Sequence, residues 1–169
     1  STFLNLNNST AYGIELVSSQ TINKDLRVNA NVSYFRTEIK GTAATSELNQ
    51  NSYSWTARLN SNYNLMQDLS LQLTANYNAP IVMAQMKMEE QFGVDLGARK
   101  TFMNGALALN LRVSDVFNTR KFNSESFGNG FNTFSRSKNE SRNVFLGITY
   151  SLNNFKAQER KTGVDSSDF

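Results

Sequence analysis

Few side chains in this 169-residue sequence could do covalent or metal chemistry. The chain contains no Cys and no His, which removes the usual zinc and haem ligands, the thiolate nucleophile and the common nucleophile–base pairs. We also find no carboxylate pair, catalytic triad or phosphate-binding loop at a recognisable spacing. The sequence therefore predicts a protein that is not an enzyme, with no catalytic residue, no cofactor and no metal site.

Two segments carry side chains that could bind a ligand without catalysis. Met83, Met86 and Met88 lie within MAQMKM, and their thioethers suit copper. Because no His or Cys accompanies them, an adaptable apolar loop that packs on its neighbours is the favoured interpretation. The segment 121–141 is rich in Phe, and we favour an extension of the adjacent strands over an aromatic grip on a ligand.

The other candidates are charged residues at alternate positions of strand-like runs. The 17 basic and 14 acidic residues give a net charge of +3, and their scatter argues against a nucleic-acid partner. Pairing between neighbouring strands is the favoured role for this set, while contact with a plug or an anionic ligand stays open. The set comprises Glu15, Arg27, Arg58, Asp95, Arg99 and Arg112.

Seven runs must position these residues, and each alternates apolar with polar side chains. Strict alternation predicts a β-strand with one apolar face, as in RNVFLGITYSL (142–152), where Val144, Leu146 and Ile148 share a side. The sequence therefore predicts an all-β fold of antiparallel strands. The other runs are AYGIELVSSQTI (11–22), LRVNANVSYF (26–35), YSWTARLNSNYNL (53–65), LSLQLTANY (69–77), FGVDLGARKTF (92–102) and ALALNLRVSDVF (106–117).

The connections between the runs alternate in length. Short ones with turn-forming residues lie at 23–25, 66–68 and 104–105. Long ones lie near 40–51, 78–91 and 118–140. Short turns at one end and long loops at the other are typical of outer-membrane β-barrels, whose long loops are external.

The apolar face is predicted to lie in lipid. Enclosing the charged face in a small soluble barrel would cost several kcal/mol for each unpaired charge, whereas a wet lumen removes that cost. Tyr53 and Tyr63 are ten residues apart, as are Phe92 and Phe102, and ten tilted residues rise roughly 25 Å, the height of a lipid-facing band between aromatic girdles. The predicted girdle comprises Tyr12, Tyr53, Trp55, Tyr63, Tyr77, Phe92, Phe102 and Tyr150.

Asp115 is the one acidic residue on the apolar side of its run. A carboxylate in the middle of a bilayer is costly, so we expect Asp115 to mark the point where that strand leaves the hydrocarbon.

Seven is an odd number of strands for a bacterial single-chain barrel, which has an even number. An open sheet edge in lipid leaves backbone groups unpaired, so we expect the C-terminal part of a larger barrel. The predicted division of the chain is the end of an external loop at 1–9, membrane strands over 10–152, and a periplasmic tail at 153–169.

The chain contains six motifs in the order YGIEL (12–16), SYSWTARLNSNY (52–63), NYNAP (76–80), FGVDLGARKTF (92–102), LRVSDVFNTRKF (111–122) and ESRNVFLGITYSL (140–152). Together these motifs resemble the end of a TonB-dependent outer-membrane receptor. Nearly the whole chain is similar to the outer-membrane β-barrel family common in Bacteroidetes.

The resemblance implies a 22-stranded barrel in the bacterial outer membrane, with a plug and energy from TonB. The implied function is import of a siderophore, a glycan or a peptide. The implied partners are outer-membrane lipid, the rest of the barrel and its plug, TonB, and a surface lipoprotein as a further candidate. The resemblance also implies that Gly147, Tyr150 and Leu152 form the barrel-assembly signal, and that the C-terminus is periplasmic.

Two alternatives stay open at this point. The chain could be a small self-contained outer-membrane barrel with a structural or adhesive role, taking an eighth strand from 127–137. It could also be a soluble β-barrel binding protein with its polar face outward.

Overall fold

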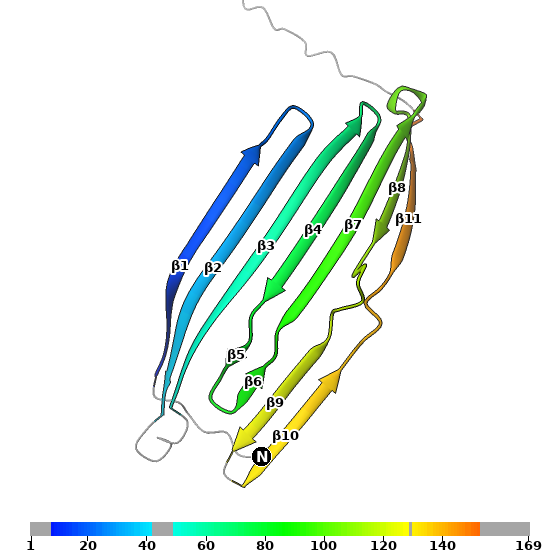
Figure 1. The fold of residues 1–169 in the computed structure, drawn as a ribbon. Helices are drawn as coiled ribbons and strands as arrows, with labels where there is room; N and C mark the ends of the chain where they lie inside the picture. Colours follow the sequence, from blue (N-terminus) through cyan, green and yellow to red (C-terminus); the bar gives the residue numbers. More distant parts are fainter. Residues whose placement is uncertain (1–7, 42–48, 129, 153–169) are drawn as a thin grey trace, which may run out of the picture.

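The computed structural model describes residues 8–41, 49–128 and 130–152. The predicted all-β, antiparallel fold is confirmed, and the seven alternating runs form one seven-stranded sheet (Figure 1). The order in the sheet follows the chain, β1-β2-β3-β4-β7-β8-β11. The bounds are β1 (Asn8–Thr21), β2 (Leu26–Lys40), β3 (Gln50–Met66), β4 (Leu69–Asn78), β7 (Gln91–Phe102), β8 (Leu107–Val113) and β11 (Val144–Tyr150).

Local turn chemistry explains how adjacent strands meet at the short connections. In the first turn the Asn23 Oδ1 accepts the backbone N–H groups of Asp25 and Leu26, each at 2.8 Å. In the third, Asn104 has a φ of 53° and Gly105 a φ of 91°, a left-handed conformation that Gly adopts without steric cost. These tight turns fix the register of the hairpins and therefore the face on which each side chain lies.

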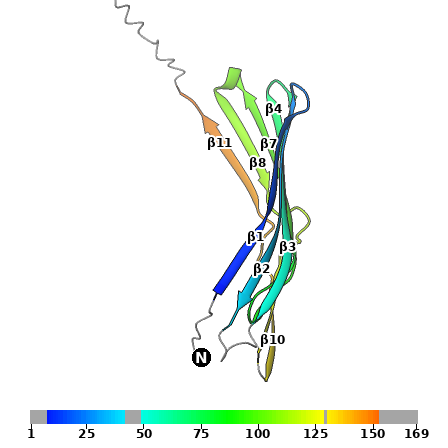
Figure 2. The same ribbon diagram turned by 90° about the vertical axis from the view of Figure 1, so that its left-hand side faces the viewer.

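Within the described ranges the sheet is a single curved layer, with no second layer packed on it (Figure 2). Among the described residues, the only buried hydrophobic side chains are Ile39, Val94 and Ala108. The large apolar side chains of the alternating runs instead stand exposed on one face, including Leu16 at 70%, Leu146 at 69% and Ile148 at 68%. An apolar face of this extent requires cover.

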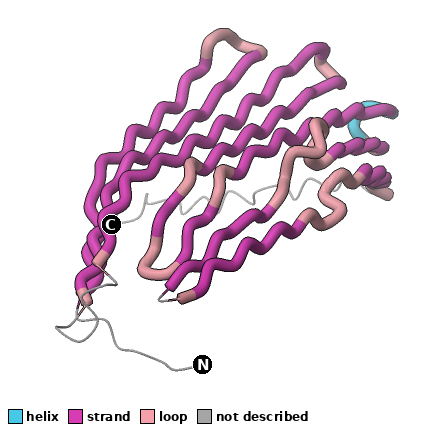
Figure 3. The backbone as a smooth tube through the Cα atoms, turned by 60° about the horizontal axis from the view of Figure 1, so that its bottom comes forward, coloured by secondary structure: helices cyan, strands magenta, loops and turns pink. Residues whose placement is uncertain are grey.

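Two of the long connections contain strands of their own, which form a second, four-stranded sheet (Figure 3). Its order is β10-β9-β6-β5, and the extension of strands predicted for 121–141 is found there. Met86 and Met88 lie in β6, opposite Ser126 and Ser124 of β9. The bounds are β5 (Ile81–Val82), β6 (Met86–Met88), β9 (Phe122–Gly128) and β10 (Phe131–Ser137).

The second sheet continues the first beyond an interruption that we call the wall break. The break consists of the connections 79–80, 89–90, 114–121 and 138–143, which separate β4 from β5, β7 from β6, β8 from β9, and β11 from β10. β3 is not interrupted there. It belongs to the seven-stranded sheet and also contacts β5 of the second sheet, where the Ser52 Oγ accepts the N–H of Val82 at 3.0 Å.

Both outer strands of the seven-stranded sheet, β1 and β11, have a neighbour on one side only among the described residues. The barrel is therefore not closed within this part of the chain. β10 pairs with β9 in the second sheet, so it does not supply the eighth wall strand of the self-contained alternative. Residues 1–7, the centre of the first long loop and the predicted tail at 153–169 lie outside the described residues.

No helix in the described ranges has the length and apolar character needed to cross a bilayer.

Candidate functional site

The strand register brings the six charged candidates to one face of the sheet. Asn31 lies opposite Arg58, and Arg58 lies opposite Asn76 on the next strand. Cross-strand partners lie on the same face of a sheet, and so do alternate residues along one strand. The other candidates are therefore on the same face as Arg58. This polar face, opposite the apolar face, holds all six: Glu15, Arg27, Arg58, Asp95, Arg99 and Arg112. That the polar face lines a lumen stays a prediction.

Neutral side-chain amides, more than opposite charges, are the partners of these residues. The Arg58 Nε donates to the Asn76 Oδ1 at 2.9 Å, and the Glu15 carboxylate accepts a hydrogen bond from Asn31. Among the six, only Arg112 and Asp95 form an ion pair, at 3.3 Å. The abundance of Asn in the strands therefore has a physical role, because the amides form hydrogen bonds with the charged groups of the polar face.

Aromatic residues gather at both ends of the apolar face. Tyr63, Phe102 and Tyr150 lie near the short turns, and the other five predicted girdle residues lie near the long connections. Trp55 packs on Tyr77 with ring centroids 4.6 Å apart.

Two residues that sequence reasoning left out join this aromatic cluster. Tyr34 stacks on Tyr53 with ring centroids 6.2 Å apart. The Arg36 guanidinium lies 5.4 Å from the centre of the Tyr53 ring and 5.9 Å from that of Tyr12. Placement in a lipid interface stays a prediction for the whole set.

The predicted assembly-signal residues lie at the end of β11. Gly147 is on the polar face opposite Asn110, and Tyr150 is on the apolar face opposite Leu107. Leu152 follows the strand and is 90% exposed. Their role in assembly stays a prediction.

Asp115 does not point outward as its parity suggested. Its φ of 46° breaks the strand, and its side chain is fully buried, with 0% exposure. It lies in the segment 114–121, which we call the clip. The Asp115 carboxylate accepts hydrogen bonds from the N–H and hydroxyl of Thr119, the N–H of Arg120 and the hydroxyl of Ser141.

These donors make the buried carboxylate strongly acidic. Desolvation by burial raises the pKa of Asp115, but hydrogen bonds from Ser141, Arg120 and Thr119 outweigh it and lower the pKa to about 2. The carboxylate is therefore ionised at neutral pH. It holds the clip in its folded shape and connects the clip to the 138–143 connection.

A second carboxylate fastens the clip to the wall. The Asp95 Oδ1 accepts the N–H of Asp115 at 2.9 Å and a guanidinium N–H of Arg120 at 2.7 Å. Arg120 reaches Asp95 by crossing Gly93, where a Cβ would stand 2.4 Å from its Nε. Asp95 is thus shared between the wall residue Arg112 and the clip residue Arg120.

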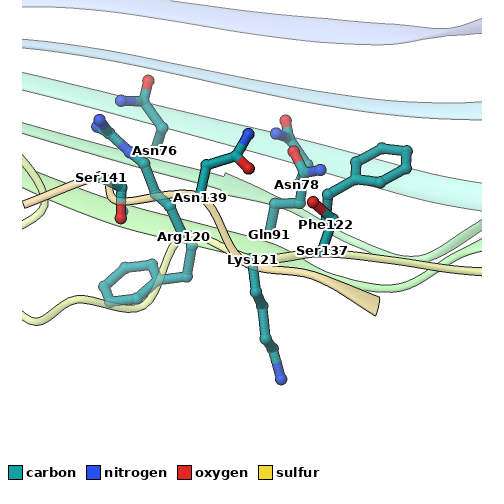
Figure 4. A pocket seen from close by; sticks show the side chains of 11 residues that line it. Asn76, Asn78, Gln91, Arg120, Lys121, Phe122, Ser137, Asn139 and Ser141 are labelled. Atoms are coloured by element: carbon teal, nitrogen blue, oxygen red, sulfur yellow. The ribbon is translucent and has the colours of Figure 1, made fainter. Parts of the chain in front are cut away.

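A cavity of about 240 Å³ lies at the wall break, beside the clip (Figure 4). Its lining comes from the ends of β4, β7, β9 and β10 and from the connections between them. Sequence reasoning missed this site, because Arg120 and the amide residues of the lining lie in or next to segments predicted as loops. The motif SDVFNTR (114–120) was the available signal, since Asp and Asn favour turns with side-chain hydrogen bonds.

A single-layer antiparallel sheet with one exposed apolar face, one amide-rich charged face and aromatic residues at both ends defines an outer-membrane β-barrel wall. Comparison with protein families agrees: the model of the "Outer membrane protein beta-barrel family" matches residues 1–150. The chain belongs to this family, and outer-membrane localisation follows. No match was found among curated proteins or among solved structures.

Proposed function

We propose that this chain is part of the barrel wall of a TonB-dependent outer-membrane receptor that imports a nutrient. The observation that carries the proposal is that β1 and β11 each have one edge with no neighbouring strand among the described residues. An unpaired strand edge cannot face hydrocarbon, because its N–H and C=O groups have no partner there. Under this proposal, further strands of a larger barrel pair with the edges of β1 and β11.

The proposal also uses the polar face. Its charges and amides suit a wet lumen that holds a plug and passes a small solute, such as a siderophore, a glycan or a peptide. The role is non-enzymatic. The partners under this proposal are outer-membrane lipid, the remaining barrel with its plug, TonB and a surface lipoprotein, and the C-terminus is periplasmic.

The alternative is a small barrel in which β1 pairs directly with β11. Engineered disulfides separate the two, because a bridge forms only between Cα atoms within about 7 Å and the chain has no Cys of its own. We would combine Ser18→Cys in β1 with Leu146→Cys or Ile148→Cys in β11, in the intact protein in its native membrane. Val28→Cys with Ser61→Cys, at cross-strand partner positions, is the positive control.

The larger barrel predicts a bridge in the control and none between β1 and β11 within one molecule. It also predicts an intact mass from the native membrane far above 19.0 kDa. An intramolecular β1–β11 bridge together with a mass near that value would refute the proposal.

A further inference from the structure

The cavity at the wall break is lined from both sheets. Asn76 and Asn78 come from the end of β4, and Gln91 comes from the start of β7. Ser137 ends β10, and Asn139 lies in the connection that returns to β11. Figure 4 shows Asn76, Asn78 and Asn139 grouped around one space. A group bound there would touch the wall and its extension at once.

The two basic residues of the lining do not make this an anion site. The Arg120 guanidinium is 2.7 Å from the Asp95 carboxylate, which it shares with Arg112, so it is already paired with a carboxylate of the wall. The Lys121 side chain extends away from the grouped amides (Figure 4). Apart from this paired guanidinium and the rings of Phe92 and Phe122, the side chains that face the space are uncharged amides and hydroxyls.

Amides and hydroxyls both donate and accept hydrogen bonds, which is also true of the hydroxyl groups of a sugar. Phe122 adds an aromatic ring to the lining, and such a ring offers an apolar surface to the C–H face of a sugar ring. The volume of about 240 Å³ is below the roughly 300 Å³ at which pockets for drug-sized ligands begin. The space suits one ring of a larger ligand.

We propose that the cavity at the wall break is a binding subsite for an uncharged, hydroxyl-rich group, one ring of a sugar. This inference rests on the proposed function and narrows it, because it selects a neutral glycan from the solutes that an import receptor of this kind could carry. Arg120 acts here as a positioning residue, since it holds the clip against the wall beside the cavity.

The test uses the intact protein, purified from its outer membrane in detergent, and saturation-transfer difference NMR, which detects weak ligands. The probes are the neutral trisaccharides maltotriose, cellotriose and mannotriose, with trialanine as a peptide that has no charged side chain and citrate as an anion. The variants are Asn78→Ala and Asn139→Ala. Asn62→Ala is the matched control, because Asn62 lies on the same polar face but lines two other hollows and not this cavity.

We expect saturable binding of at least one trisaccharide, weakened about fivefold by each of Asn78→Ala and Asn139→Ala and unchanged by Asn62→Ala. Binding of citrate or trialanine in place of every trisaccharide would overturn the inference while leaving import intact. Sugar binding that Asn62→Ala weakens as much as the two lining variants would overturn it too, and so would no trisaccharide binding. The disulfide and mass measurements report on the proposed function separately.

Discussion

The buried carboxylate of Asp115 allows a quantitative test of the clip. We consider Asp115→Asn, which keeps the size and shape of the side chain but replaces one acceptor oxygen with an NH₂ group. Asp115 Oδ2 accepts the N–H of Arg120 at 2.9 Å and the hydroxyl of Ser141 at 2.5 Å, while Oδ1 accepts two hydrogen bonds from Thr119. An Asn in either orientation therefore turns an NH₂ toward at least one N–H donor.

Two routes give similar magnitudes for the loss. Losing one hydrogen bond to a charged acceptor costs about 1.5–3 kcal/mol. The fall of the Asp115 pKa from 3.8 to about 2 corresponds to about 2 kcal/mol, because one pKa unit is worth about 1.4 kcal/mol. We therefore expect the clip to open about 2 kcal/mol more easily in the variant, which is about a 30-fold loss of hydrogen-exchange protection.

The pH dependence has a definite sign. Because the pKa of Asp115 is lower in the folded protein, its contribution to stability is fully present above about pH 4 and disappears as the pH falls through 2. Wild type and Asp115→Asn should differ at pH 7 and converge near pH 2. Hydrogen exchange followed by mass spectrometry of the peptides that cover 114–121, in the intact protein, measures both quantities.

The control is Asp68→Asn, at the opposite end of the strands. Hydrogen bonding to Lys100 lowers the pKa of Asp68, but Asp68 lies in a short turn far along β4 and β7 from the clip. The control should leave exchange in 114–121 unchanged. Equal protection in wild type and Asp115→Asn at pH 7, or a difference that persists unchanged at pH 2, would refute the reasoning.

Three further predictions address the wall itself. Gly93→Ala should displace Arg120 from Asp95 and lower the stability of the fold by about 1–3 kcal/mol, measured as a lower temperature at which the protein changes its migration on a gel. Gly97→Ala is the control, because its Cβ would stand 3.6 Å from the Gln72 Cβ, an ordinary contact, and equal behaviour of the two variants would contradict the clip geometry. Leu73→Arg on the apolar face should make the free energy of insertion into lipid vesicles less favourable by about 2–4 kcal/mol. Gln72→Arg on the polar face should leave that free energy unchanged, and equal losses would contradict the assignment of the faces. The contribution of Trp55 to the fluorescence is the difference between wild type and Trp55→Phe. This contribution should be quenched more by lipids brominated near the headgroup than by lipids brominated near the chain end; the reverse order would contradict the placement of Trp55 in the girdle.

Much of the wall could be predicted from the chain because its signals are local. Alternation over a few residues, as in Leu107, Leu109 and Leu111 against Ala108 and Asn110, specifies a strand and its two faces without any distant contact. The short turns follow from Asn, Asp and Gly at particular positions. The choice of lipid for the apolar face followed from the energy of burying charge, and membership of an outer-membrane barrel family agrees with it.

What the chain did not reveal depends on contacts between segments distant in sequence. β6 pairs with β9 across more than thirty residues. Two long connections therefore form one sheet, although a strand extension was predicted only for the one over 121–141. The site at the wall break arose in the same way, because Asp95 is 25 positions from its partner Arg120. Asp115 shows the limit most clearly: its parity predicted an outward side chain, but a left-handed backbone turn redirected it toward donors supplied by Thr119, Arg120 and Ser141.

The sequence by itself thus determined the strands, their faces and the class of protein, since period-two alternation and turn residues act over a few bonds. Only the tertiary structure decided where the wall breaks, how the clip closes that break, and that a polar cavity remains beside it. The physical reason is that buried charges and amides take the partners that the whole fold brings within hydrogen-bonding distance, and no local pattern encodes that distance.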